Sequence, residues 1–241
     1  MKKLLLGLLL ISSVLSFGAT QRVSSEKLET NESKDILYLA GTKTPYSGEA
    51  EIRYPSGQLL SVATFKNGKI NGKAYEYYPS GQLKLEENYI NGKLNGLSKS
   101  YYENGQLKDE TPYKNDKKEG IVKTYIENGT LISEVTFKNG VVVGKSKLYN
   151  TKTGKLAAES NINNRKIEGV SKEYYPSGKV ANEVNFKNDI EDGITKIYYE
   201  SGKLKGEATY KNGQLDGLAK IYDENGKLVE QATYKNGQKI K

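Results

Sequence analysis

The stretch from Tyr77 to Gly96, YYPSGQLKLEENYINGKLNG, contains one short pattern twice. YPSGQL, from Tyr78 to Leu83, is followed eleven residues later by YINGKL, from Tyr89 to Leu94. Both read as a tyrosine, a turn with a glycine, a polar residue and a leucine. The segment between the two turns is too short for a helix and rich in strand formers. The stretch therefore predicts a β-hairpin repeat with two kinds of turn.

The same unit recurs along most of the chain, at steps of 24 residues with a single step of 25. Its leading glycines are Gly48, Gly72, Gly96, Gly120, Gly144, Gly169, Gly193 and Gly217. Each unit also carries an asparagine followed by Gly, Asp or Arg, and Asn-Gly between strand-like segments is a strong hairpin signal. These asparagines are Asn67, Asn91, Asn115, Asn139, Asn164, Asn188, Asn212 and Asn236. The count predicts eight tandem hairpins over residues 48–241.

The composition favours a thin sheet over a compact core. Only 36% of residues are hydrophobic, and the aromatics are 19 Tyr against 4 Phe and no Trp. Tyrosine rings can pack while their hydroxyls stay in water. Stacking the units aligns one aromatic row through Tyr77 and Tyr198 and another through Phe65 and Tyr210. The predicted fold is all-β: an elongated, single-layer antiparallel meander of tandem β-hairpin repeats, with a bulge near the leading glycines and a weak point near residues 150–168.

The N-terminal residues predict export. Lys2 and Lys3 precede an apolar run from Leu4 to Leu15 and then small residues, which is the layout of a secretory signal peptide over residues 1–19. Residues 20–34 are polar and predict a flexible lead-in. Residues 35–47 have strand character and predict capping strands before the first repeat. The expected location is outside the cytoplasm: the periplasm, the cell surface or the extracellular space.

The residue types present exclude most catalytic chemistry. The chain contains no His and no Cys, so the commonest general base, zinc sites built from these residues, and thiol nucleophiles are absent. A recurrent glutamate row, for example Glu183 and Glu207, repeats at two strand spacings, about 9.5 Å, which is at or beyond the long end of the range for an inverting glycosidase pair. Regular repetition is also the wrong signature for a catalytic site, which needs one asymmetric place. We predict a protein that is not an enzyme and needs no cofactor or metal.

Two residue rows are candidate binding sites. Exposed tyrosines beside the hairpin turns are candidates for contact with a protein partner, because aromatic residues are common interface hot spots. They are Tyr78, Tyr102, Tyr175 and Tyr199. A lysine row is a candidate for anion binding, with cross-strand pairing to the glutamates as the favoured alternative. Its members are Lys172, Lys196 and Lys220.

The unit Asn91–Gly96 followed by Tyr101–Gly105 resembles the MORN repeat, and more closely its bacterial variant, often labelled an antitoxin-component repeat. The resemblance covers about residues 35–241 and departs from the pattern most in the fifth unit. It implies a single elongated antiparallel sheet that acts as an interaction platform. An exported chain would not neutralise a toxin in its own cytoplasm, so the antitoxin label carries little weight.

The sequence thus predicts a secreted, non-enzymatic repeat scaffold, a monomer, that mediates protein–protein interaction at the cell envelope or outside the cell. The partner is an unidentified protein, and a host-facing role is compatible with this reading. The alternative is a module that binds an envelope glycan or a phospholipid membrane surface. The mildly basic charge, +8 before removal of the predicted signal peptide, is spread among interleaved acids and predicts no nucleic-acid partner.

Overall fold

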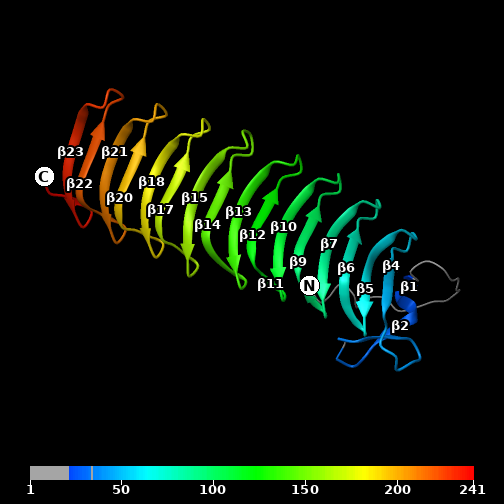
Figure 1. Cartoon of the computed structure of the whole chain (residues 1–241). Helices are drawn as coiled ribbons and strands as arrows, with labels where there is room; N and C mark the ends of the chain where they lie inside the picture. Colours follow the sequence, from blue (N-terminus) through cyan, green and yellow to red (C-terminus); the bar gives the residue numbers. More distant parts are fainter. Residues whose placement is uncertain (1–21, 34) are drawn as a thin grey trace. The chain divides into compact units, whose positions relative to one another are not determined.

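A computed structural model describes residues 22–33 and 35–241; the predicted signal peptide lies outside them. The fold is all-β, a mostly antiparallel and unclosed sheet of tandem hairpins, as the sequence predicts (Figure 1). The chain divides into two units, residues 1–117 and 118–241, which we describe separately.

The first unit contains the strands up to the start of β11. Their bounds are β1 (Arg22–Ser24), β2 (Leu28–Thr30), β3 (Leu37–Leu39), β4 (Gly48–Arg53), β5 (Leu59–Lys66), β6 (Lys69–Tyr77), β7 (Leu83–Ile90), β8 (Lys93–Leu94), β9 (Gly96–Tyr101), β10 (Leu107–Lys114) and β11 (Lys117–Lys118). A single 3-10 turn, η1 (Ser25–Lys27), separates β1 from β2.

The second unit continues the same succession of hairpins. Its strands are β12 (Gly120–Tyr125), β13 (Leu131–Lys138), β14 (Val141–Tyr149), β15 (Leu156–Asn163), β16 (Lys166–Ile167), β17 (Gly169–Tyr174), β18 (Val180–Lys187), β19 (Ile190–Glu191), β20 (Gly193–Tyr198), β21 (Leu204–Lys211), β22 (Gln214–Tyr222), β23 (Leu228–Lys235) and β24 (Gln238–Lys239).

The asparagine turns have positive φ at both central residues, the signature of a type I′ hairpin turn. Asn91 and Gly92, for example, have φ of 49° and 80°. Three turns hold another residue in the second position: Asp116, Arg165 and Asp189 adopt φ of 66°, 65° and 69°. The predicted turn chemistry is confirmed, including at the three positions where glycine is missing.

The other turn of each repeat is wider. The Tyr78 carbonyl accepts a hydrogen bond from the Gly81 amide at 2.8 Å, and the Tyr78 amide donates to the Gln82 carbonyl at 2.8 Å. In the fifth repeat, Asn150 and Lys155 close a turn that is one residue longer. The ladder nevertheless continues there, because β14 pairs with β15 and β15 pairs with β16 and β17. The weak point that the sequence suggested is not a break in strand pairing.

Bulges at both turns settle which side chains share a face. The pairing of β5 with β6 shifts register between the partners Ala63↔Ala74 and Phe65↔Ile70. The leading glycine Gly72 lies within this shift, which confirms the predicted bulge. Each leading glycine is the cross-strand partner of an aromatic or aliphatic side chain, as in Gly72↔Tyr89 and Gly193↔Tyr210. We call this side of the sheet the glycine face. The opposite side carries alternating lysines and glutamates such as Lys196 and Glu207, and it is called the charged face.

The N-terminal segment is more structured than the sequence suggests. The sequence predicts a flexible lead-in over residues 20–34, whereas β1 pairs in parallel with β4 and β2 pairs with β3. The reason is a small apolar cluster under this segment, in which Leu28 and Tyr46 are buried with Phe65. The amide of Leu37 donates to the carbonyl of Gly68, and the amide of Gly68 donates to the carbonyl of Tyr46. These contacts fix the segment over the first repeat.

Burial is shallow elsewhere. No large side chain among the described residues is fully enclosed, and several buried positions hold alanine, serine or threonine. A sheet with both faces exposed to solvent cannot enclose large side chains, so backbone pairing and cross-strand contacts supply the stability.

Candidate functional site

The charged face of the second unit carries an alternating row of lysine and glutamate, here called the charge ladder. Each member is the cross-strand partner of the next. Its members are Lys123, Glu134, Lys147, Glu159, Lys172, Glu183, Lys196, Glu207 and Lys220. Opposite charges placed directly across strands stabilise a sheet. The ladder therefore has the structural role that the sequence favoured for these residues.

The candidate anion-binding lysines belong to this ladder. The Nζ atom of Lys172 lies 2.9 Å from Glu183, and that of Lys220 lies 3.0 Å from Glu207. Lys196 lies across the strands from both glutamates. The hydrogen bond from Lys172 lowers the pKa of the Glu183 carboxyl, and the hydroxyl of Tyr198 lowers it further. Anion binding by this row stays a prediction, and the geometry supports ion pairing within the chain.

The first aromatic row is joined to the ladder through its hydroxyl groups. Tyr149 donates to Glu134 at 2.7 Å and Tyr174 donates to Glu159 at 3.0 Å. Burial, followed by these carboxylates, raises the pKa of both tyrosines to about 12. The sequence predicted an aligned tyrosine row with hydroxyls in water, whereas these hydroxyls donate to carboxylates, and the residue pattern does not reveal those bonds.

The candidate partner-binding tyrosines are half-buried. Three of them connect successive repeats, because their hydroxyls donate to a backbone carbonyl 23 residues further on: Tyr78 to Tyr101, Tyr175 to Tyr198 and Tyr199 to Tyr222. Lysine ammonium groups lie over the rings of Tyr78, Tyr102 and Tyr199, at 5.8, 5.4 and 5.6 Å from the ring centroids. Partner binding through them stays a prediction, and any partner would meet ring surface rather than a free hydroxyl.

Exposed aliphatic side chains are the feature that the sequence analysis missed. On the glycine face, Ile197 and Ile221 are 44% and 48% exposed and are both cross-strand partners of Gly206. On the charged face, Ile194 and Leu218 are 47% and 41% exposed. The sequence signal for these side chains was the alternation of apolar and other residues within the segments IYY and LAKIY. The positions of the bulges could not be read from the sequence, so it did not show which residues share a face.

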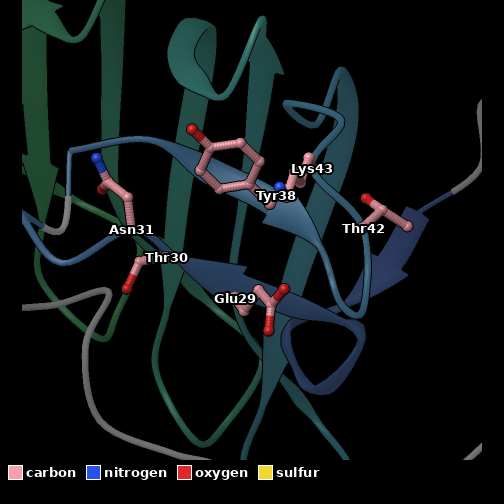
Figure 2. A pocket seen from close by; sticks show the side chains of 6 residues that line it. All are labelled: Glu29, Thr30, Asn31, Tyr38, Thr42 and Lys43. Atoms are coloured by element: carbon pink, nitrogen blue, oxygen red, sulfur yellow. The ribbon is translucent and has the colours of Figure 1, made fainter.

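A shallow hollow of about 320 Å³ lies in the N-terminal segment (Figure 2). Its lining comes from β2, β3 and the adjoining loops: Glu29, Thr30, Asn31, Tyr38, Thr42 and Lys43. The carboxylate of Glu29 accepts a hydrogen bond from the Gly41 amide, and Asn31 caps its own loop. These polar groups hold the segment together and converge on no common point.

No cluster of three or more acidic side chains in residues 22–33 and 35–241 could hold a metal ion. Over the same ranges, we find no helix of the length and apolarity that crossing a bilayer requires.

One family model matches the amino-acid sequence of this chain. No curated protein matches the chain. Among solved structures, an alternansucrase in complex with isomaltononaose aligns over 88% of this chain, at 17% sequence identity and a TM-score of 0.20. The alignment covers 18% of the alternansucrase, so this chain spans less than a fifth of that enzyme's length. The model described as "MORN repeat variant" matches seven stretches: 46–67, 70–91, 94–115, 118–139, 167–188, 191–212 and 215–236. The unmatched interval holds the irregular fifth repeat. These matches cover more than half of the sequence in register with the observed hairpins, and the chain belongs to the MORN repeat variant family.

Proposed function

We propose that this repeat protein is an exported, non-enzymatic scaffold that binds a protein partner at the cell envelope or outside the cell. The observation that carries the proposal is the isoleucine pair, Ile197 and Ile221, on the glycine face of the second unit. Both side chains are nearly half exposed. Exposed apolar side chains gathered at one place are typical of interaction sites.

The register explains why the pair is accessible. Ile197 in β20 and Ile221 in β22 lie on either side of Gly206 in β21. Gly206 has no side chain, so nothing at that position separates the two isoleucines, which lie two strand spacings, about 9.5 Å, apart. A glycine within a strand often marks a place where another group approaches closely.

Polar groups border the isoleucine pair. Tyr199 follows Ile197 by two residues and is fixed by its hydrogen bond to the Tyr222 carbonyl. The ammonium group of Lys205 lies over its ring. An apolar centre with an ordered aromatic and a polar border is the usual anatomy of a protein interface. The partner chemistry that fits is a protein surface with a large apolar side chain.

The same features argue against the alternatives. Sugar rings are bound by aromatic faces and hydrogen-bonding groups, whereas the isoleucine pair offers neither. The lysine row that the sequence offered for anion binding does not favour lipid phosphates, because Lys172 and Lys220 form ion pairs with glutamates. A protein partner is therefore the function that these residues support best.

Export is the second part of the proposal. The charged start at Lys2 and Lys3, followed by the apolar run to Leu15, supports it. Cell fractionation of the full chain and of a chain lacking residues 1–19 tests it. Loss of processing and of export should accompany the deletion, and equal distribution of the two proteins would contradict this part.

Partner binding is tested with a matched pair of variants. The mature protein is used as bait for envelope and culture-supernatant proteins, together with an Ile197→Ser/Ile221→Ser variant. The control is Ile194→Ser/Leu218→Ser, which changes the same two strands on the other face at similar exposure. We expect a captured protein to be lost only with the isoleucine pair. A protein lost equally with both variants, or retained by both, would refute the assignment.

A further inference from the structure

The asparagine-turn edge of the first unit carries a group of exposed lysines, here called the basic edge. They flank three successive two-residue turns: Lys66, Lys69, Lys93, Lys114 and Lys117. Lys66 and Lys69 are direct cross-strand partners, and Lys114 and Lys117 flank the Asn115–Asp116 turn. Like charges placed directly across strands destabilise a sheet. Because these lysines recur along one edge, their mutual repulsion calls for an effect that compensates it.

The residues that cap these turns explain why the charge is uncompensated. In six of the repeats, a side chain just before the leading glycine accepts a hydrogen bond from the amide of the turn asparagine 20 residues later. In the first unit this role falls to neutral groups: Ser47 caps Asn67 at 2.8 Å, and Asn71 caps Asn91 at 2.9 Å. Asn95, at the same place in the next repeat, is also neutral.

The second unit makes the same bond with carboxylates. Glu119, Glu168, Asp192 and Asp216 cap Asn139, Asn188, Asn212 and Asn236. Each of these turns is preceded by a lysine, and the Asp216 carboxylate is 3.1 Å from Lys235. The hydrogen bond from Lys235 lowers the pKa of the Asp216 carboxyl, and Lys211 adds to the effect. The two units thus build this turn in two ways, with a neutral cap in the first and an acidic cap in the second, and the acidic cap Asp216 forms an ion pair with Lys235.

Asp116 and Asp35 are carboxylates near the basic edge, and each is engaged in hydrogen bonds of its own. Asp116 accepts the amide of Leu94 at 2.9 Å. Asp35 accepts hydrogen bonds from Asn31 and Ser33 and feels the charge of Lys69. Five lysines against these two acids leave a positive field along the edge.

We propose that the basic edge binds a linear anionic polysaccharide. Its lysines lie along a line at two strand spacings, about 9.5 Å, so that a chain bearing regularly spaced carboxylate or sulfate groups can contact several turns at once. That interval is close to the screening length of about 8 Å at physiological ionic strength, so the turns act together at low salt.

A single-stranded nucleic acid would require aromatic stacking platforms. The aromatics near this edge, such as Phe65 and Tyr89, instead lie on the glycine face opposite the leading glycines. The site is separate from the isoleucine pair and does not depend on the proposed protein partner.

The test compares two sets of four lysines. Dextran sulfate binding is measured for the mature protein and for Lys66→Gln/Lys69→Gln/Lys114→Gln/Lys117→Gln. The control is Lys138→Gln/Lys187→Gln/Lys211→Gln/Lys235→Gln, which removes the same charge from the acid-capped turns of the second unit. The logarithm of the affinity should fall with the logarithm of the salt concentration at a slope of about 0.7 for each neutralised charge. With about four neutralised charges, we expect the wild type to lose about 50-fold in affinity between about 50 and 200 mM salt. The first variant should lose most of this binding, and the control should retain it. Equal losses in the two variants would overturn the proposal.

A second variant changes the field without removing a lysine. Asn71→Asp keeps an acceptor for the Asn91 amide and adds a negative charge beside the edge, so dextran sulfate binding should weaken several-fold while thermal unfolding stays the same. Unchanged binding would contradict the proposal. Vesicles containing phosphatidylserine and a single-stranded oligonucleotide serve as competing probes. Tighter binding of either one through the same four lysines would also overturn the polysaccharide assignment.

Discussion

Replacing Arg165 by glycine should stabilise the protein. Arg165 occupies the second position of a type I′ turn at φ 65°. The left-handed conformation costs a non-glycine residue about 1–2 kcal/mol. Glycine removes that cost but adds about 0.4–1 kcal/mol of unfolded-state entropy. The expected net gain is about 0.5–1 kcal/mol.

The matched comparison is Asp189→Gly, at the same turn position and φ 69°. Here the carboxylate accepts the amide of Ile167 at 2.6 Å, a bond that glycine cannot make. Losing it costs about 1 kcal/mol and offsets the relief of the backbone. Urea and thermal unfolding followed by circular dichroism should place Arg165→Gly above wild type, and Asp189→Gly at or below it. A lower stability for Arg165→Gly than for Asp189→Gly would refute this account of the turns.

Further expectations concern titration, inter-repeat contacts and dimensions. Tyr149 and Tyr174 have folded pKa values raised to about 12 from an unfolded value of about 10, so the stability they contribute is present at neutral pH and is lost as pH rises through 12. Ultraviolet titration of Tyr→Phe variants checks this prediction. Ionisation of both tyrosines near pH 10 would contradict it. The pKa of Glu183 is lowered, so its contribution is present above its unfolded pKa and is lost in acid, and Glu183→Gln should flatten the acid limb of the stability profile. Tyr199→Phe should cost about 1 kcal/mol through loss of the bond to the Tyr222 carbonyl, and no measurable cost would show that the bond is not stabilising. The elongated form stays a prediction from the sequence: small-angle scattering should give a radius of gyration well above the value of about 17 Å for a compact domain of this length, and a value near it would oppose the prediction.

The hairpin repeat could be predicted because its signals are local. Asn-Gly turns and the glycines of the wider turns fix where strands end, and their spacing fixes the unit. Even the substitutions at Asp116 and Asp189 keep the turn, since aspartate tolerates the left-handed conformation. The opposition of lysine and glutamate across strands could also be predicted, because the two rows repeat at the same interval.

Features that depend on the bulges could not be predicted. One extra residue moves the following side chains to the other face, so the sequence did not show that Ile197 and Ile221 share a face with Gly206. The contrast between neutral and acidic turn caps was equally hidden. Its hydrogen bonds join residues 20 positions apart, as between Asn71 and Asn91, and the register between repeats brings them together.

The most direct test of the account removes one repeat. Deleting residues 193–216 joins Asp192 to Gly217 and reproduces the Asp216–Gly217 junction of the wild type. If contacts run between neighbouring hairpins, the shortened protein should stay folded, unfold cooperatively and lose only one repeat's share of stability. It should also lose the captured protein partner, because Ile197 and Gly206 are removed, and keep dextran sulfate binding through the first unit. A deletion variant that is unfolded, or one that is folded and still binds the protein partner, would contradict a scaffold of separable repeats with its protein site at the isoleucine pair.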